Sequence, residues 1–213
     1  MTLIASLIDV VLHLDVHLAA LIAGIGLPTT YAIIFLIIVC ETGLVIAPFL
    51  PGDSLLFAAG ALSAQGLLNV WVLLPLLWLA AVVGDSLNYA IGKHIGVKAF
   101  RKDSRFLNHD HLEQTRAFFK RHGGKSIVLA RFLPFVRTGA PFVAGVSHMP
   151  YGTFLFYNVA GGAIWVGLFV LGGTFFGQIP AVEKNFSLVI LAILAFSAVP
   201  ATIAWVRSRF KRA

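Results

Sequence analysis

The chain alternates long apolar stretches with short polar breaks, which is the pattern of a helical membrane protein. Residues 54–84 contain no charged side chain over 31 positions, and residues 138–182 contain none over 45. As one continuous helix the first stretch would be about 46 Å long, well beyond the hydrocarbon core of roughly 30 Å. The second would be longer still. Each stretch is therefore expected to contain a break.

Glycine and proline residues supply those breaks. They are Pro48, Pro51, Gly60, Gly66, Pro134, Pro141, Gly145 and Pro150. We expect two broken segments, at about 45–66 and 126–149, which enter the membrane without crossing it. Full spans are expected at about 70–92, 151–178 and 185–206, the last ending just before a basic tail.

The N-terminal part is apolar but less regular. Residues 3–26 carry Asp9, His13 and His17 at spacings of four, which would place them on one stripe of a helix. This segment is either an interfacial helix or a short span, and the sequence favours neither. Residues 29–50 are apolar with one charge, and their Cys40, the single cysteine of the chain, excludes an internal disulfide and is expected to pack against other helices.

The composition excludes most soluble classes. Hydrophobic residues make up 59% of the 213 positions, charged residues 12%, and the mean hydropathy is +0.90. Soluble domains carry about 25% charged residues. An ordinary cytosolic enzyme, a disulfide scaffold and a disordered chain are all excluded, and one membrane domain over 1–213 is expected.

The net charge of +7 sets orientation rather than nucleic-acid binding. Residues 1–92 contain five acids and no Lys or Arg, whereas residues 93–137 contain eleven of the sixteen bases and the tail 207–213 four more. Basic segments beside apolar spans stay on the cytoplasmic side. The loop 93–125 and the tail are therefore predicted to be cytoplasmic, with a surface helix at 110–122. In this topology the two broken segments enter from opposite faces.

The loop also holds a group of residues that looks superficially like a metal site. The group is His109, Asp110, His111 and His122. Its spacing matches no zinc pattern, so a solvated surface is expected, without metal or cofactor.

Four charges close to the broken segments are the candidate functional residues. They are Glu41, Asp53, Arg131 and Arg137. Each costs about 2.5–3.5 kcal/mol at the bilayer centre, so together they cost roughly 10–14 kcal/mol before compensation. They must pair, face water or bind something charged. Purely structural pairing is one interpretation, and a substrate or ion pathway is the favoured one.

The residue types favour an anionic lipid head group and protons as partners. Guanidinium groups hold phosphate in two-pronged geometry, while a carboxyl group in a low-dielectric site can exchange a proton near neutral pH. A third polar cluster contains Asp85 and Asn88, on one face of the 70–92 span. It is either a helix-packing hydrogen bond or a gate or proton relay beside Arg131 or Arg137.

The two broken segments also resemble each other. Each contains Phe-Leu-Pro, at 49–51 and 132–134, followed by a charge and then Ala-Gly, at 59–60 and 144–145. Combined with opposite topology, this predicts an all-α integral membrane protein built as an inverted repeat: two opposed re-entrant segments plus about four transmembrane or interfacial helices.

Three ordered motifs resemble the signatures of the DedA family of bacterial inner-membrane proteins. They are Glu41-Thr42-Gly43 with Phe49-Leu50-Pro51-Gly52-Asp53-Ser54; Gly84-Asp85-x-x-Asn88-Tyr89-x-x-Gly92; and Arg131-Phe132-x-Pro134-x-x-Arg137-Thr138-x-x-Pro141-x-x-Ala144-Gly145. The resemblance implies opposed re-entrant segments and movement of lipids between leaflets, of undecaprenyl phosphate or a phospholipid, dependent on the proton gradient.

The same resemblance assigns roles to residues. Glu41 and Asp53 match the family's required acidic pair, with a proton-coupling role, and Arg131 and Arg137 match its arginine pair, which would bind lipid phosphate. Supporting positions are Pro51, Gly52, Asp85, Asn88, Pro134, Thr138 and Gly145.

Other function classes make different predictions. A proton-coupled exporter of small solutes or cations would use the same acids, but the arginine pair suits cationic cargo poorly. A membrane enzyme is not expected, since no lipid-phosphatase, serine-protease or alcohol-phosphatidyltransferase motif is present. A membrane-shaping scaffold would tolerate Glu41→Gln.

Overall fold

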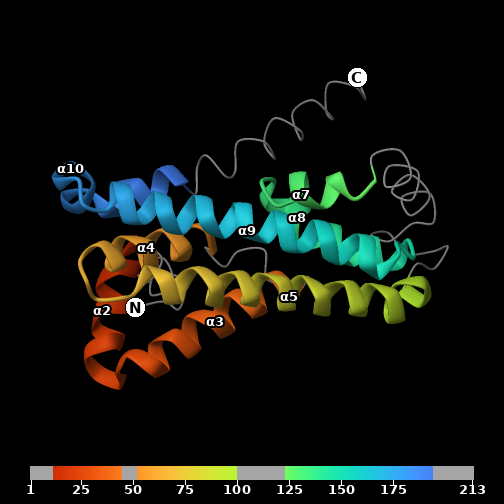
Figure 1. Ribbon diagram of the computed structural model, residues 1–213, viewed down its shortest axis with the longest axis horizontal. Coiled ribbons are helices and arrows are strands. Elements are labelled where there is room, and N and C mark those ends of the chain that lie inside the picture. Colours follow the sequence, from red (N-terminus) through yellow and green to blue (C-terminus); the bar gives the residue numbers. More distant parts are fainter. Residues whose placement is uncertain (1–11, 45–51, 100–122, 194–213) are drawn as a thin grey trace.

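The computed structural model describes residues 12–44, 52–99 and 123–193 (Figure 1). Over these ranges the chain is helical and forms no strand, in agreement with the predicted all-α class. The helices are α2 (Leu14–Ile25), α3 (Leu27–Gly43), α4 (Gly52–Ala64), α5 (Val70–Ala99), α7 (Lys125–Ala130), α8 (Pro134–Val146), α9 (Tyr151–Phe176) and α10 (Pro180–Lys184). Residues 186–193 are helical as well.

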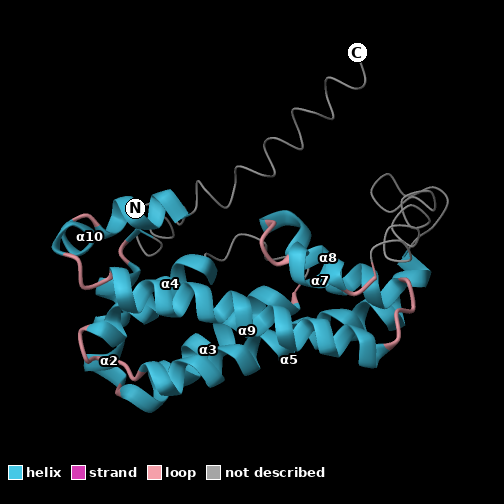
Figure 2. Cartoon of the chain, turned by 45° about the horizontal axis from the view of Figure 1, so that its top comes forward, coloured by secondary structure: helices cyan, strands magenta, loops and turns pink. Residues whose placement is uncertain are grey.

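The two longest helices, α5 and α9, lie side by side and run antiparallel along the length of the molecule (Figures 1 and 2). Both are long and apolar enough to cross a membrane, over Val70–His94 and Tyr151–Phe176. The indole N–H of Trp78 on α5 donates to the carbonyl of Val159 on α9 at 2.9 Å, and Asn158 Nδ2 donates to the Val82 carbonyl at 3.1 Å. Polar bonds between the two helices thus set their register.

Two short helices, α4 and α8, pack on the long ones at opposite ends (Figure 1). Glycines make these crossings close, because a methyl group at each would collide with a backbone carbonyl of the partner helix. The contacts are Gly60 with Val170, Gly173 with Phe57, Gly145 with Tyr89 and Gly92 with Phe142. The short helix α4 therefore packs on α9, and the short helix α8 packs on α5, so each contacts the long helix from the other half of the chain. In both crossings the contacted carbonyl residue and the glycine of each helix are three positions apart.

The helix starts agree closely with the sequence prediction, and the ends less so. Helices α5 and α9 begin at the predicted residues, 70 and 151, but α5 continues to Ala99, so the predicted loop 93–125 starts about two turns too early. Lys93 and His94 are tolerated in a helix, and glycine at 96 alone does not end it. The surface helix at 110–122 and most of the last span lie outside the described residues.

Two minor predictions about the N-terminal half are wrong. Cys40 is exposed rather than packed, because the buried stripe of α3 runs through Ile34, Ile38 and Glu41 and leaves Cys40 on the other face. His13 precedes the first turn of α2, so it does not continue the stripe of His17 along one helix. Asp9 lies outside the described residues.

Candidate functional site

Arg137 is the centre of the first charged cluster. Its Nη1 donates to Asp53 Oδ1 at 2.5 Å, and its Nη2 forms an ion pair and hydrogen bond with Glu41 Oε1. The Glu41 side chain is fully buried, and the other two side chains are only 10% and 13% exposed. One guanidinium thus holds two carboxylates from different helices in a largely buried position.

The fold brings this cluster together from three helix ends. Asp53 lies in the first turn of α4, Arg137 in the first turn of α8, and Glu41 in the last turn of α3. The backbone N–H of Gly52 donates to Glu41 Oε1 at 3.2 Å, and any side chain at Gly52 would overlap the Glu41 carboxylate. Glycine at position 52 therefore leaves room for the Glu41 carboxylate as it lies here. The first turns of α4 and α8 meet here.

Arg131 is the centre of a second cluster. Its Nη2 donates to Asp85 Oδ2 and to Asn158 Oδ1, both at 2.5 Å. The Arg131 and Asp85 side chains are each 5% exposed. Arg131 directly follows α7 and meets α9 where Gly161 and Gly162 carry no side chain. The absence of Cβ atoms there gives the long arginine side chain room to lie against α9.

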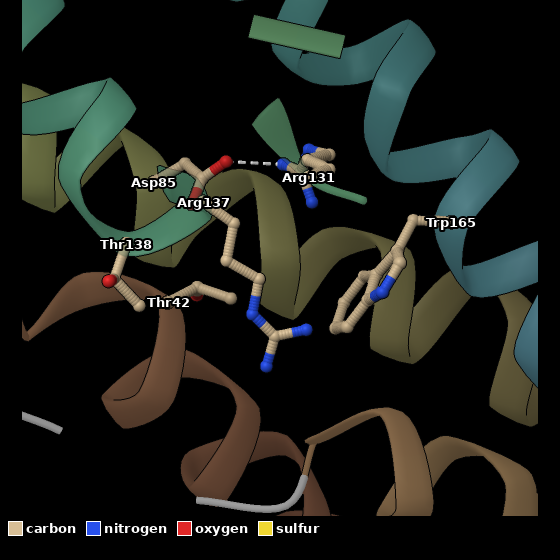
Figure 3. A pocket seen from close by; sticks show the side chains of 6 residues that line it. All are labelled: Thr42, Asp85, Arg131, Arg137, Thr138 and Trp165. Carbon is tan, nitrogen blue, oxygen red and sulfur yellow. Dashed lines mark hydrogen bonds and ion pairs between the residues drawn. The ribbon is translucent and has the colours of Figure 1, made fainter. Parts of the chain in front are cut away.

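The Trp165 side chain lies next to both clusters (Figure 3). Its indole N–H donates to Asp53 Oδ1 at 2.9 Å. The guanidinium carbons of Arg137 and Arg131 lie 5.2 Å and 5.9 Å from the ring centroid, within cation–π distance. The two arginines therefore share one aromatic ring.

A small pocket joins the clusters (Figure 3). Its lining residues are Thr42, Asp85, Arg131, Arg137, Thr138 and Trp165. The interior admits about one water-sized sphere, so a lipid head group fits only after side chains or helices move. With all groups ionised, Glu41, Asp53 and Asp85 together with the two arginines carry a net charge of −1.

The predicted supporting residues hold the helices around this pocket. Asn88 Nδ2 donates to the backbone carbonyls of Thr42 at 3.1 Å and Thr138 at 2.7 Å, which connects α5 to α3 and α8. Pro134 is the first residue of α8, where its missing N–H removes no helical bond. Gly145 allows the close crossing of α8 and α5 described above. Pro51 lies outside the described residues.

The structure brings Glu41, Asp53 and Arg137 together and pairs Arg131 with Asp85. The sequence leaves open which carboxylate meets which arginine. For Asp85, the interpretation as a group beside Arg131 agrees with the geometry. Over the described residues no group of three or more His, Cys, Asp and Glu side chains could hold a metal ion. The His109 group lies outside them.

Sequence reasoning gave no role to three residues of the site: Asn158, Trp165 and Thr42, the last of which was named only as part of the first motif. All are uncharged, so a search for charges in apolar segments passes over them. A usable signal existed for two. Asn158 is a carboxamide in a span with few polar groups, and Trp165 lies halfway along that span, away from the interfaces where tryptophan is enriched.

Comparisons with known proteins point to one family. The VTT domain family matches residues 50–175. The chain is 51% identical to "Protein DedA" of Escherichia coli K12 over 212 residues, which covers 98% of this chain and 96% of that protein. It is 45% identical to an uncharacterized membrane protein of Mycobacterium leprae, over 85% of this chain and 80% of the relative. It is 36% identical to the E. coli K12 "Inner membrane protein YghB", over 73% of this chain and 71% of that protein. No solved structure matches.

Proposed function

This chain belongs to the DedA family of membrane proteins, whose VTT domain it carries, and from that premise we propose that it moves an anionic phospholipid between the leaflets of the bacterial inner membrane, coupled to protons. Undecaprenyl phosphate and glycerophospholipids are the candidate substrates. The activity changes no covalent bond, so the transported lipid is expected to be recovered chemically unchanged.

The observation that carries the proposal is the double carboxylate pair of Arg137. Both of its terminal nitrogens hold carboxylate oxygens, from Glu41 and Asp53, at the point where the first turns of α4 and α8 meet. A guanidinium binds two phosphate oxygens in the same two-pronged geometry. The carboxylates thus occupy the positions that a lipid phosphate would take.

Proton uptake is what would release Arg137 for the lipid. A buried carboxylate that loses its cationic partner is strongly destabilised unless it is protonated. Glu41 is fully buried, so its separation from Arg137 would be accompanied by protonation. The phosphate would then bind Arg137, and release of the lipid on the other side would restore the ion pairs and return the protons.

The paired crossings of short and long helices support an inverted repeat with re-entrant segments. Helices α4 and α8 have 13 residues each, or about 20 Å, too short to cross a core of roughly 30 Å. Their first turns meet at Arg137 and their last turns pack toward opposite ends of the α5–α9 pair (Figure 2). We place the loop 93–125 and the tail 207–213 in the cytoplasm. Reporter fusions at these two segments test this orientation.

The decisive experiment is lipid flipping in vesicles reconstituted with the purified protein. Labelled undecaprenyl phosphate and labelled anionic and zwitterionic phospholipids are compared, with and without a pH gradient. Arg137→Lys keeps the charge but loses the two-pronged contact, and Arg137→Ala loses both. We expect the lysine variant to be reduced by at least about ten-fold and the alanine variant to be inactive.

The control is Lys184→Ala. Lys184 is an exposed cation of α10 and does not line the pocket, so we expect this variant to flip lipid at the wild-type rate. Flipping that survives Arg137→Ala at the wild-type rate would contradict the assignment. If no lipid moves and the same vesicles take up a labelled small cation against the pH gradient, the exporter interpretation replaces this one.

A further inference from the structure

Trp165 has an unusual position for a tryptophan in a membrane protein. It lies halfway along α9 and is 1% exposed, whereas tryptophans in membrane helices concentrate at the interfaces. Trp71, by contrast, is 79% exposed at the start of α5. An indole at mid-depth must find a partner for its N–H, and the partner here is a carboxylate.

The carboxylate oxygen bound by Trp165 is also the one bound by Arg137. Asp53 Oδ1 accepts from Trp165 Nε1 at 2.9 Å and from Arg137 Nη1 at 2.5 Å. The indole N–H therefore holds Asp53 in the position in which it meets the guanidinium. The same ring lies within cation–π distance of Arg137 and of Arg131, which belongs to the other cluster.

We propose that Trp165 is a positioning residue that joins the two arginine clusters into one substrate site. Its N–H fixes Asp53 against Arg137, and its ring holds the guanidinium groups of both clusters at the shared pocket (Figure 3). The ring attracts each cation strongly because the site is desolvated. A phosphate that displaces Asp53 from Arg137 thereby also disturbs the surroundings of Arg131. The transport part of this inference rests on the proposed function.

The flipping assay separates the two contributions of the indole. Trp165→Phe keeps an aromatic ring and removes the N–H, while Trp165→Leu removes both. Loss of a hydrogen bond to a charged group predicts a reduction of about ten-fold for the phenylalanine variant, and the additional loss of the ring predicts about 100-fold for the leucine variant.

Trp78→Phe is the matched control. Trp78 Nε1 also donates over 2.9 Å to α9, but to the backbone carbonyl of Val159 and not to a carboxylate. We expect its rate to stay within about two-fold of the wild type. Equal reductions in Trp165→Phe and Trp78→Phe would show a merely structural role and overturn the proposal.

A fluorescence measurement tests the junction even if no lipid is moved. The emission of Trp165 is taken as the wild-type spectrum minus that of Trp165→Phe, both in detergent. The same difference, with and without Trp165→Phe, is taken in the Arg137→Gln and Asp85→Asn variants. We expect the emission maximum of Trp165 to shift in both, because Arg137→Gln changes the cluster at Asp53 and Asp85→Asn changes the cluster at Arg131.

Each result of that measurement is decisive. A shift with both variants supports the proposal. A shift with only one of the two variants confines Trp165 to one cluster and overturns the junction, and no shift with either overturns the proposal entirely. Absence of flipping in the wild type would instead refute the proposed function and leave this spectroscopic result standing.

Discussion

The buried pair of Arg131 and Asp85 allows the stability of the protein to be separated from its activity. Both side chains are 5% exposed, and Arg131 Nη2 also donates to Asn158 Oδ1. Asp85→Leu leaves a buried guanidinium without its carboxylate. Removal of one partner from a buried ion pair costs about 3–5 kcal/mol. For a chain of this size, that corresponds to a melting temperature about 6–20 °C lower.

The double variant Asp85→Leu with Arg131→Met is expected to recover most of that loss. An apolar pair of similar volume is close to neutral or stabilising compared with a buried ion pair. The remaining cost is the Asn158 oxygen, which loses its Arg131 donor; an unsatisfied buried acceptor costs about 1–3 kcal/mol. The single Arg131→Met variant leaves both Asp85 and Asn158 without this donor and is expected to be the least stable of the three.

Thermal unfolding of the purified variants in one detergent, followed by circular dichroism, measures these differences. Flipping in vesicles is measured in parallel, and the double variant is expected to be folded but inactive. The reasoning is refuted if Asp85→Leu melts at the wild-type temperature, or if the double variant loses the sum of the two single losses. Either result would mean that Arg131 and Asp85 are not energetically coupled.

Two further predictions concern the helix crossings and the protons. Gly60→Leu and Gly145→Leu are each expected to lower the melting temperature strongly, because the added side chain meets a backbone carbonyl of the partner helix. Gly167→Leu is the control. No atom lies within 4 Å of the point where its Cβ would be, so this variant should have the melting temperature of the wild type. Glu41→Gln keeps the shape of the side chain but cannot exchange a proton, so flipping by this variant should lose its dependence on an imposed pH gradient; an undiminished dependence would exclude Glu41 as a proton carrier.

Local features of the sequence were sufficient to place the starts of α5 and α9. Pro150 directly before α9 and the polar Asn69 directly before α5 mark helix starts by local chemistry alone, and both starts agree with the prediction. The end of α5 was missed because Lys93 begins a polar segment without ending the helix. Hydropathy reports where the membrane ends, and a helix can continue past that point into water.

The pairing of the charges could not be predicted in the same way. The sequence identifies five charged residues within or beside apolar segments, namely Glu41, Asp53, Asp85, Arg131 and Arg137. Which acid meets which arginine depends on how α5, α8 and α9 pack. Arg131 and Arg137 are six residues apart, yet α8 begins between them and directs them to different partners. Arg131 also lies against Gly161 and Gly162 of α9, and these glycines carry no chemical signal of their own.

Charge balance offers a physical reason for coupling lipid to protons under the proposed function. The three carboxylates and two guanidinium groups of the site carry a net charge of −1 when ionised. A lipid phosphate that entered without protons would raise the buried negative charge to at least −2, at a cost of several kcal/mol per uncompensated ion. Protonation of Glu41 and Asp53 offsets that charge and at the same time frees both terminal nitrogens of Arg137. Proton uptake and phosphate binding would then be linked at the same guanidinium, without a separate proton pathway.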